Sequence, residues 1–368
     1  MIRSKRRVID LRWRARSLAA GLLSLACLWD QPASAAVFPE LYSVRVPMTL
    51  EVPLGGQQPT EQDYIRLAMG QLLTRVTGRS DAFLEPLLQD LVQSAARYVE
   101  QRGYLDRQTL LVRFDARAVE AALVERHQPL WGEERPLTLL WLAIDGGSGN
   151  RSMLSAEALE QQGSGELVAL EQALRGELHA VAQERGLPLT LPLLDLQDMG
   201  AVTFADVWGG FSDRVRQASL RYQPDAILTG RVRVTDFGID VQWTLLRGRG
   251  QYILPGRTLR GGLDRLADLY AGEFSTIGGA STTRVSVLGV ATLDDYGRVM
   301  RHIESLSVLE SVAVDELTQD NVLLLRVSAR GGQSVLQRVL ALSDVLTPAP
   351  VSPDAGEAPG QLIFNLVR

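Results

Sequence analysis

The sequence is poor in the residues that most often carry chemistry. Its only lysine is Lys5 and its only cysteine is Cys27. Beyond residue 27 the chain therefore has no lysine for a Schiff base or a phosphate-binding loop, no thiol nucleophile, no thiolate metal site and no disulfide. The three histidines, His127, His179 and His302, show no metal-ligand spacing. We expect no cofactor and no bound metal, and a fold stabilised by buried apolar side chains.

The N-terminal segment has the pattern of a secretory signal. A basic stretch precedes an apolar run over residues 18–29, and Pro32 and several small residues follow. We predict a signal peptide over residues 1–36 that is cleaved after Ala35 or Ala36, which places the mature protein in the periplasm. An uncleaved N-terminal anchor is the alternative. The apolar run is too short for a helix that stays in the bilayer, and no later run is long enough to span one.

Two special types of signal fit this segment less well. Cys27 would be lipidated in a lipoprotein signal, but residues 24–26 lack the aliphatic and small side chains that precede such a cysteine. Arg6 and Arg7 form the pair found in twin-arginine signals, but Asp10 and its neighbours depart from that pattern. A general export signal is the preferred interpretation.

Removal of residues 1–36 leaves an acidic chain. The remainder has 31 arginines and 41 acidic residues, a net charge near −10. An acidic protein with scattered arginines is a poor binder of nucleic acid and of anionic membrane surfaces. We therefore expect the partner to be another envelope protein, with no nucleic acid and no transmembrane segment in the mature chain.

Hydrophobic periodicity predicts an N-terminal module over residues 37–132 with the order β-α-α-β-α. Thr60 and Asp63 have the spacing of a capping box, and Gly78 is the expected end of the helix that follows. The expected elements are strands over 41–52 and 110–114 and helices over 60–78, 84–102 and 115–126.

A second module is predicted over residues 135–274 as a mixed-sheet α/β sandwich. Residues 137–144 are apolar on both faces, as a central strand of a covered sheet must be. Glu133 and Glu134, just before this module, are interpreted as a solvated linker. The expected elements are strands over 137–144, 187–195 and 225–234, a hairpin over 240–246 and 251–254, and helices over 167–185, 212–222 and 263–274.

The third module, over residues 283–368, follows a Ser/Thr/Gly-rich linker at 275–282. Its predicted order, β-α-β-β-α-β, is that of a split-βαβ ferredoxin-like unit. Thr292 and Asp295 again have capping-box spacing. The expected elements are strands over 284–290, 309–317, 321–328 and 362–367 and helices over 292–305 and 332–345. The fold class is thus α/β and α+β in three small modules.

Candidate site residues are concentrated between Asp195 and Phe211. Asp195 follows a predicted strand, at the position where open α/β sheets bind ligands. Asp198 and Asp206 could join it as oxygen ligands for a cation or as an acid–base pair. The alternative is structural, because aspartates cap helices.

The same region contains the candidate contact residues Trp208, Gly209, Gly210 and Phe211. The tryptophan beside two glycines could form a flat surface for a partner. The structural alternative has Trp208 and Phe211 filling the space between sheet and helices, while the glycines allow close approach.

Five motifs lie at residues 44–47, 71–78, 96–100, 130–136 and 204–211. They resemble those of an exported proteobacterial family, the domain-of-unknown-function family 2066. The helix that ends Leu-Leu-Thr-Arg-Val resembles the N-terminal domain of flagellar assembly protein T. Tyr222-Gln-Pro-Asp-Ala-Ile-Leu-Thr-Gly230 resembles the N-terminal domain of TolB and the lipoprotein activators of penicillin-binding proteins. These resemblances imply a non-enzymatic envelope component and supply no catalytic residues.

Three functions remain open at this point. The first is an exported, non-catalytic envelope protein, a scaffold or assembly factor, that binds another protein through its edge strands. The second is a hydrolase that uses Asp195, Asp198 or Asp206. The third is a module that binds a small ligand or glycan at the same aspartates. A buried, convergent set of these aspartates would favour the second, and exposed edge strands would favour the first.

Overall fold

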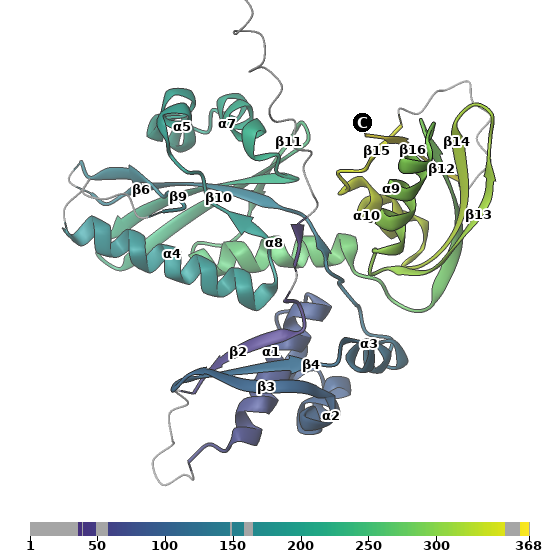
Figure 1. Cartoon of the computed structure of the whole chain (residues 1–368). Helices are drawn as coiled ribbons and strands as arrows, with labels where there is room; N and C mark the ends of the chain where they lie inside the picture. Colours follow the sequence, from purple (N-terminus) through teal and green to yellow (C-terminus); the bar gives the residue numbers. More distant parts are fainter. Residues whose placement is uncertain are drawn as a thin grey trace, which may run out of the picture. The chain divides into compact units, whose positions relative to one another are not determined.

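The structure is a computed structural model that describes residues 36–38, 40–48, 58–147, 149–157, 165–349 and 361–367 (Figure 1). The predicted signal peptide, with Cys27 and Ala35, lies outside the described residues except for Ala36. Ala36 begins the short strand β1 (Ala36–Val37), which pairs with β5 (Glu134–Arg135). The described residues belong to one compact unit. The fold is a mixed α/β fold with several modules, as predicted.

The N-terminal module packs one long helix on a three-stranded sheet of order β2-β4-β3. Thr60 and Asp63 form the predicted capping box, and Gly78 ends the helix in the left-handed conformation with φ 70°. Its elements are β2 (Ser43–Pro47), α1 (Glu61–Thr77), α2 (Gln89–Gln93), β3 (Val99–Asp106), β4 (Thr109–Phe114) and α3 (Ala116–Glu125).

The predicted helix over 84–102 is wrong. The chain there forms short 3-10 turns, Ala82–Leu84, Pro86–Leu88 and Ala95–Tyr98, around the brief helix α2, and then enters β3. Pro86 favours the start of a new helical turn, because a proline in the interior of a helix would break it. The strand was missed because β3 lies at the edge of the sheet and has no buried face, so its sequence lacks apolar alternation.

The middle module has a mixed sheet of order β11-β10-β9-β6-β7, with β8 also beside β6. Its central strands β6 and β9 are parallel, and the β9–β10–β11 meander is antiparallel. The strands are β6 (Thr138–Asp145), β7 (Arg151–Met153), β8 (Leu189–Thr190), β9 (Ala226–Thr235), β10 (Gly238–Arg247) and β11 (Gly250–Leu254).

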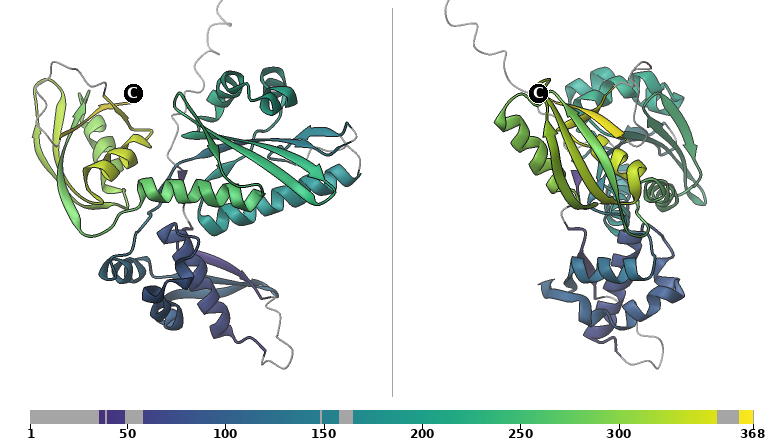
Figure 2. Two further views of the ribbon diagram at one scale, coloured as in Figure 1. Left: turned by 180° about the vertical axis from the view of Figure 1, so that it is seen from behind. Right: turned by 90° about the vertical axis from the view of Figure 1, so that its right-hand side faces the viewer.

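Helices cover both faces of this sheet (Figures 1 and 2). Alternate residues of β6 enter two cores: Leu140 and Leu142 belong to the core with α4 and α8, and Leu139 and Trp141 to the core with α5, α6 and α7. The predicted strand over 187–195 is mostly wrong, because Pro188 and Pro192 limit β8. The helices are α4 (Gly165–Arg185), α5 (Leu196–Ala201), α6 (Phe204–Gly209), α7 (Ser212–Ser219) and α8 (Leu259–Phe274).

The C-terminal module has the sheet order β13-β14-β12-β16-β15. Its first half is the predicted split crossover, since β14 lies antiparallel between β12 and β13. The second half departs from the ferredoxin-like order: a short strand β15 was missed, and the closing strand β16 is parallel to β12. The elements are β12 (Ala280–Leu288), α9 (Leu293–Glu304), β13 (Leu309–Leu317), β14 (Val322–Arg330), α10 (Gly332–Ala341), β15 (Leu346–Pro348) and β16 (Gln361–Leu366).

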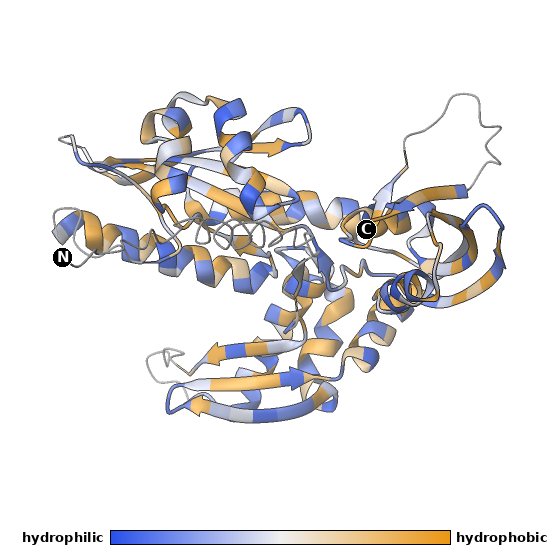
Figure 3. Cartoon of the chain, turned by 45° about the horizontal axis from the view of Figure 1, so that its top comes forward, coloured by the Kyte–Doolittle hydropathy of each residue, from blue (hydrophilic) through white to orange (hydrophobic). Residues whose placement is uncertain are grey.

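Coloured by hydropathy, the helices and strands carry hydrophobic bands between hydrophilic ones, as expected for elements with one buried face (Figure 3). Among the described helices, none has the length and apolar content needed to cross a membrane.

The modules are joined around Arg135, which is fully buried. Its guanidinium donates to the carbonyl oxygens of Arg75 (2.9 Å) near the end of α1, and of Arg185 (3.1 Å) and Gly186 (2.8 Å) at the end of α4. It also lies 3.9 Å from the centre of the Trp131 ring. A cation is favourable at the negative end of a helix, and here one side chain binds two such ends.

The interpretation of residues 133–134 as a solvated linker is wrong for Glu134. Its side chain is buried and accepts hydrogen bonds from the backbone N–H and the hydroxyl of Ser307 in the C-terminal module. In parallel, Arg330 donates to Glu120 of the N-terminal module over 3.1 Å. The segment before the middle module is therefore a junction of three modules.

Candidate functional site

Asp195 and Asp198 lie together at the start of α5, as the sequence suggested. Asp195 caps the helix by accepting from the backbone N–H of Asp198 (2.9 Å). Arg221 donates to both carboxylates, over 2.8 Å to Asp195 and 3.0 Å to Asp198. Asp198 is 1% exposed and also accepts from the Tyr222 hydroxyl and the Leu194 N–H. Both carboxylates are therefore engaged in hydrogen bonds and ion pairs within the protein, and that of Asp195 also caps α5.

The Arg221 hydrogen bonds lower the pKa of Asp195 to about 2. A carboxyl group with such a pKa is ionised at neutral pH and cannot serve as a general acid there. Arg221 and Tyr222 both lie in the 3-10 turn Leu220–Tyr222, which precedes β9, and both bind Asp198.

Asp206 has a separate role at the start of α6. It forms a capping box with Thr203, and Arg214 donates to it over 3.0 Å. Hydrogen bonds from Thr203, followed by the charge of Arg214, lower the pKa of Asp206. The arginine that binds Asp206 is thus a different one from the arginine shared by the other two aspartates. Within the described ranges, no cluster of three or more His, Cys, Asp or Glu residues could hold a metal ion.

The Trp208 region is partly a surface. Trp208 is half-buried and stacks on Phe204, with ring centres 5.2 Å apart, and the Arg233 guanidinium lies 5.6 Å from its ring centre. Gly210 ends α6 with φ 76°, and a side chain at Gly209 would collide with the ring of Phe211. Phe211 itself is 59% exposed, so the expectation that it fills the interior is wrong.

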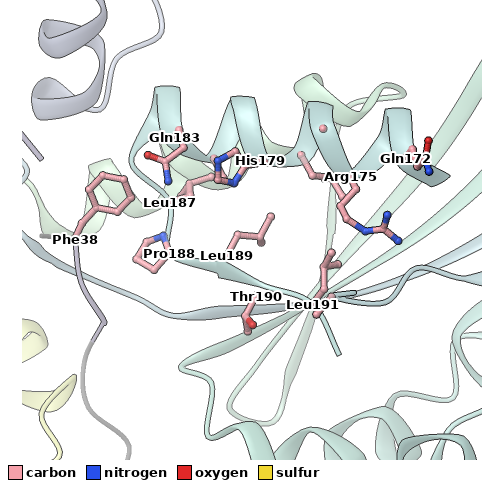
Figure 4. Close-up of a pocket in the computed structure, with 14 residues that line it drawn as sticks. Phe38, Gln172, Arg175, His179, Gln183, Leu187, Pro188, Leu189, Thr190 and Leu191 are labelled. Carbon is pink, nitrogen blue, oxygen red and sulfur yellow. The ribbon is translucent and has the colours of Figure 1, made fainter. Parts of the chain in front are cut away.

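A groove at the middle module was not predicted from the sequence. It is a groove of about 690 Å³ between α4 and the segment 187–191 (Figure 4). Leu178, Ala182 and Leu187 form a buried apolar floor. No motif marks it, because its lining comes from one helix face and a proline-flanked strand.

Polar side chains form the helical wall of this groove. Gln172, Arg175, His179 and Gln183 are placed along one side of α4, and Figure 4 shows them opposite Leu189 and Leu191. Arg175 donates from Nε to the carbonyl of Ser155 over 3.1 Å. His179, for which the sequence indicated no partner, is exposed on this wall.

Each of the three main sheets ends on one side in an exposed strand, namely β3, β11 and β13. These strands expose apolar side chains as well as charges. An edge strand has backbone N–H and C=O groups that can pair with another chain. The exposed apolar residues are Tyr104 and Leu105 on β3, Tyr252 and Ile253 on β11, and Val314 and Leu317 on β13.

Comparison with known proteins gives one finding. Residues 35–132 are similar to a domain of unknown function, DUF8605. No curated protein and no solved structure matches the chain. The match covers the N-terminal module. The Asp195–Phe211 region lies outside it, as do all the residues that line the groove except Phe38.

Proposed function

We propose that this chain is an exported, non-catalytic cell-envelope protein that acts as a scaffold or assembly factor by binding another protein. Export rests on the signal pattern of residues 1–36. The motif resemblance to family 2066, and that of the middle module to the TolB N-terminal domain, agree with an envelope role without an active site.

The observation that carries the proposal is the set of exposed edge strands β3, β11 and β13. Each has exposed apolar residues, although natural proteins usually protect such edges. Charged residues on β3 and β13, such as Arg102 and Glu316, oppose indiscriminate pairing. Strand addition at a selected edge gives affinity through backbone hydrogen bonds and specificity through alternate side chains.

A hydrolase or a glycan-binding module centred on Asp195, Asp198 and Asp206 receives less support. The first two aspartates are bound to Arg221, and the third is bound to Thr203 and Arg214. Capping and ion pairing explain their positions, so a catalytic role is not needed to account for them.

Site-specific photo-crosslinking in intact cells tests the proposal. A photo-reactive amino acid is placed at Ile253 on β11, which is 84% exposed, and at Leu196 on α5, which is 86% exposed and serves as the matched control. Equivalent positions on the other edges are Tyr104 and Val314. We expect a discrete adduct with one envelope protein from at least one edge and none from Leu196. Equal labelling at edge and control positions, or no adduct at any edge, contradicts the proposal.

A further inference from the structure

The groove beside β8 has an open sheet edge along one wall. β8 is parallel to β6, with Leu189 opposite Thr138, and the Thr138 N–H donates to the Pro188 carbonyl over 2.9 Å. In a parallel ladder, alternate residues direct both backbone groups to the same neighbour. Pro188 and Thr190 therefore face β6, and the N–H and C=O groups of Leu189 face away from it. If the same alternation is continued past the end of β8, the backbone groups of Leu191 lie on the same side as those of Leu189, and both residues line the groove.

The opposite wall contains a glycine that packing does not require. Gly176 lies inside the 21-residue helix α4 and lines the groove. A Cβ built on it would meet nothing within 4 Å. Glycine in a helix interior costs roughly 1 kcal/mol relative to alanine. Its missing side chain widens the groove at the middle of the helical wall.

The size of the groove matches a short extended segment. From Gln172 to Gln183 the helical wall advances about 16 Å at 1.5 Å per residue. An extended chain covers that length with roughly five residues at about 3.3 Å each. The apolar floor offers contact to every second side chain of such a segment.

The charged residues that line the groove indicate which kind of segment would bind there. The groove is lined by one arginine, Arg175, and one histidine, His179, and by no aspartate or glutamate. A carboxylate on the bound segment would lie in a favourable field near Arg175.

We propose that this groove binds an extended, acidic segment of about five residues from the partner protein, which pairs with the outward backbone groups of Leu189 and Leu191. The proposal rests on the proposed function and specifies one docking position for it. The segment alternates apolar side chains that contact Leu178 and Ala182 with at least one carboxylate near Arg175.

The test uses the mature chain as bait for a phage-displayed library of random heptapeptides. Enriched sequences are resynthesised, and their dissociation constants are measured against wild type and variants. We expect sequences with alternating apolar residues and one or more carboxylates. Hydrogen exchange should slow at the Leu189 and Leu191 amides when such a peptide is added.

Gly176→Leu and Gly176→Ala form the matched pair of variants. The leucine fills the groove and weakens binding by about tenfold or more, whereas the alanine keeps binding within about twofold. Both variants should fold, because space surrounds the position. Replacing Arg175 with Gln should remove the preference for acidic peptides over their amide analogues, and Arg175→Lys should retain part of it.

Three results would overturn the proposal: no enrichment, equal affinity of enriched peptides for wild type and Gly176→Leu, or binding without protection of Leu189 and Leu191. None of these results bears on crosslinking through Ile253. A failure of the groove proposal can therefore be distinguished from a failure of the proposed protein-binding function.

Discussion

The junction around Arg135 and the groove beside Leu189 differ in the hydrogen bonding of their backbone groups. At the junction, one buried guanidinium donates to the carbonyls of two helix ends and to those of Trp131 and Gly132. In the groove, the backbone groups of Leu189 face outward from the sheet. The two regions are connected through Gly186, only three residues before Leu189. Buried polar groups thus hold the modules together at the junction, whereas we propose that the open strand edges contact a partner.

Replacing Arg135 with Met should produce the largest effect on the junction. It leaves five carbonyl contacts without their donor in a buried site, and we expect a loss of about 3–5 kcal/mol in the free energy of unfolding. Burial lowers the pKa of Arg135 to about 9, so the side chain is charged at neutral pH. Denaturant unfolding measures the change, with Arg117→Met at an exposed position as the control. Equal stability of the two variants would show that the junction is dispensable.

Asp198→Ala tests whether Asp198 has a structural role or a role in binding. The Tyr222 hydroxyl and the Leu194 N–H would lose a buried acceptor, which we expect to cost about 2–3 kcal/mol. Asp198→Asn keeps an acceptor and should cost less. Thermal or denaturant unfolding reports the difference. A variant that unfolds like wild type but no longer binds the crosslinked partner would instead make Asp198 a contact residue.

Gly176→Ala should stabilise the protein slightly. The position has free space and lies within α4, so helix propensity predicts a gain of roughly 0.5–1 kcal/mol. Gly78→Ala, at a left-handed helix end where a Cβ would collide with Ala271, provides the opposite control and should destabilise. A loss of stability in Gly176→Ala would mean that the groove wall is tighter than the structure shows.

The smallest effect is the pH dependence contributed by Asp195. Its pKa is lowered from the ordinary 3.8 to about 2 in the folded chain. Its contribution to stability is therefore complete above about pH 4 and is lost as pH falls through 2. The stability difference between wild type and Asp195→Asn should shrink over that interval. A difference that stays constant down to pH 2 would exclude the Arg221 pair as its source.

Sequence reasoning located most elements whose signals are local. The capping boxes at Thr60 and Thr292, the glycine end at Gly78 and the hairpin of β13 and β14 are all present. Each depends on residues within a few positions of one another, which a single sequence displays.

Elements that depend on tertiary neighbours could not be predicted in this way. β3 and β15 lie at sheet edges. β3 has no buried face, and β15 is only three residues long, so neither shows an apolar alternation. The direction of β16 depends on pairing across the module. The sequence did not mark Arg135 as a junction residue, because its partners, Arg75 and Gly186, are about 50 or more positions away. The groove has no motif at all, since its walls come from separate parts of the chain.

We propose that open strand edges bind the partner while the junction around Arg135 stays closed. Hydrogen exchange of the mature chain, with and without the protein captured by crosslinking, tests this most directly. We predict slowed exchange in β11, β13, β3 or the Leu189–Leu191 segment, and unchanged slow exchange at Trp131, whose N–H donates to the Val76 carbonyl over 2.7 Å. Protection confined to helix surfaces such as α5, with every strand edge unaffected, would contradict the account.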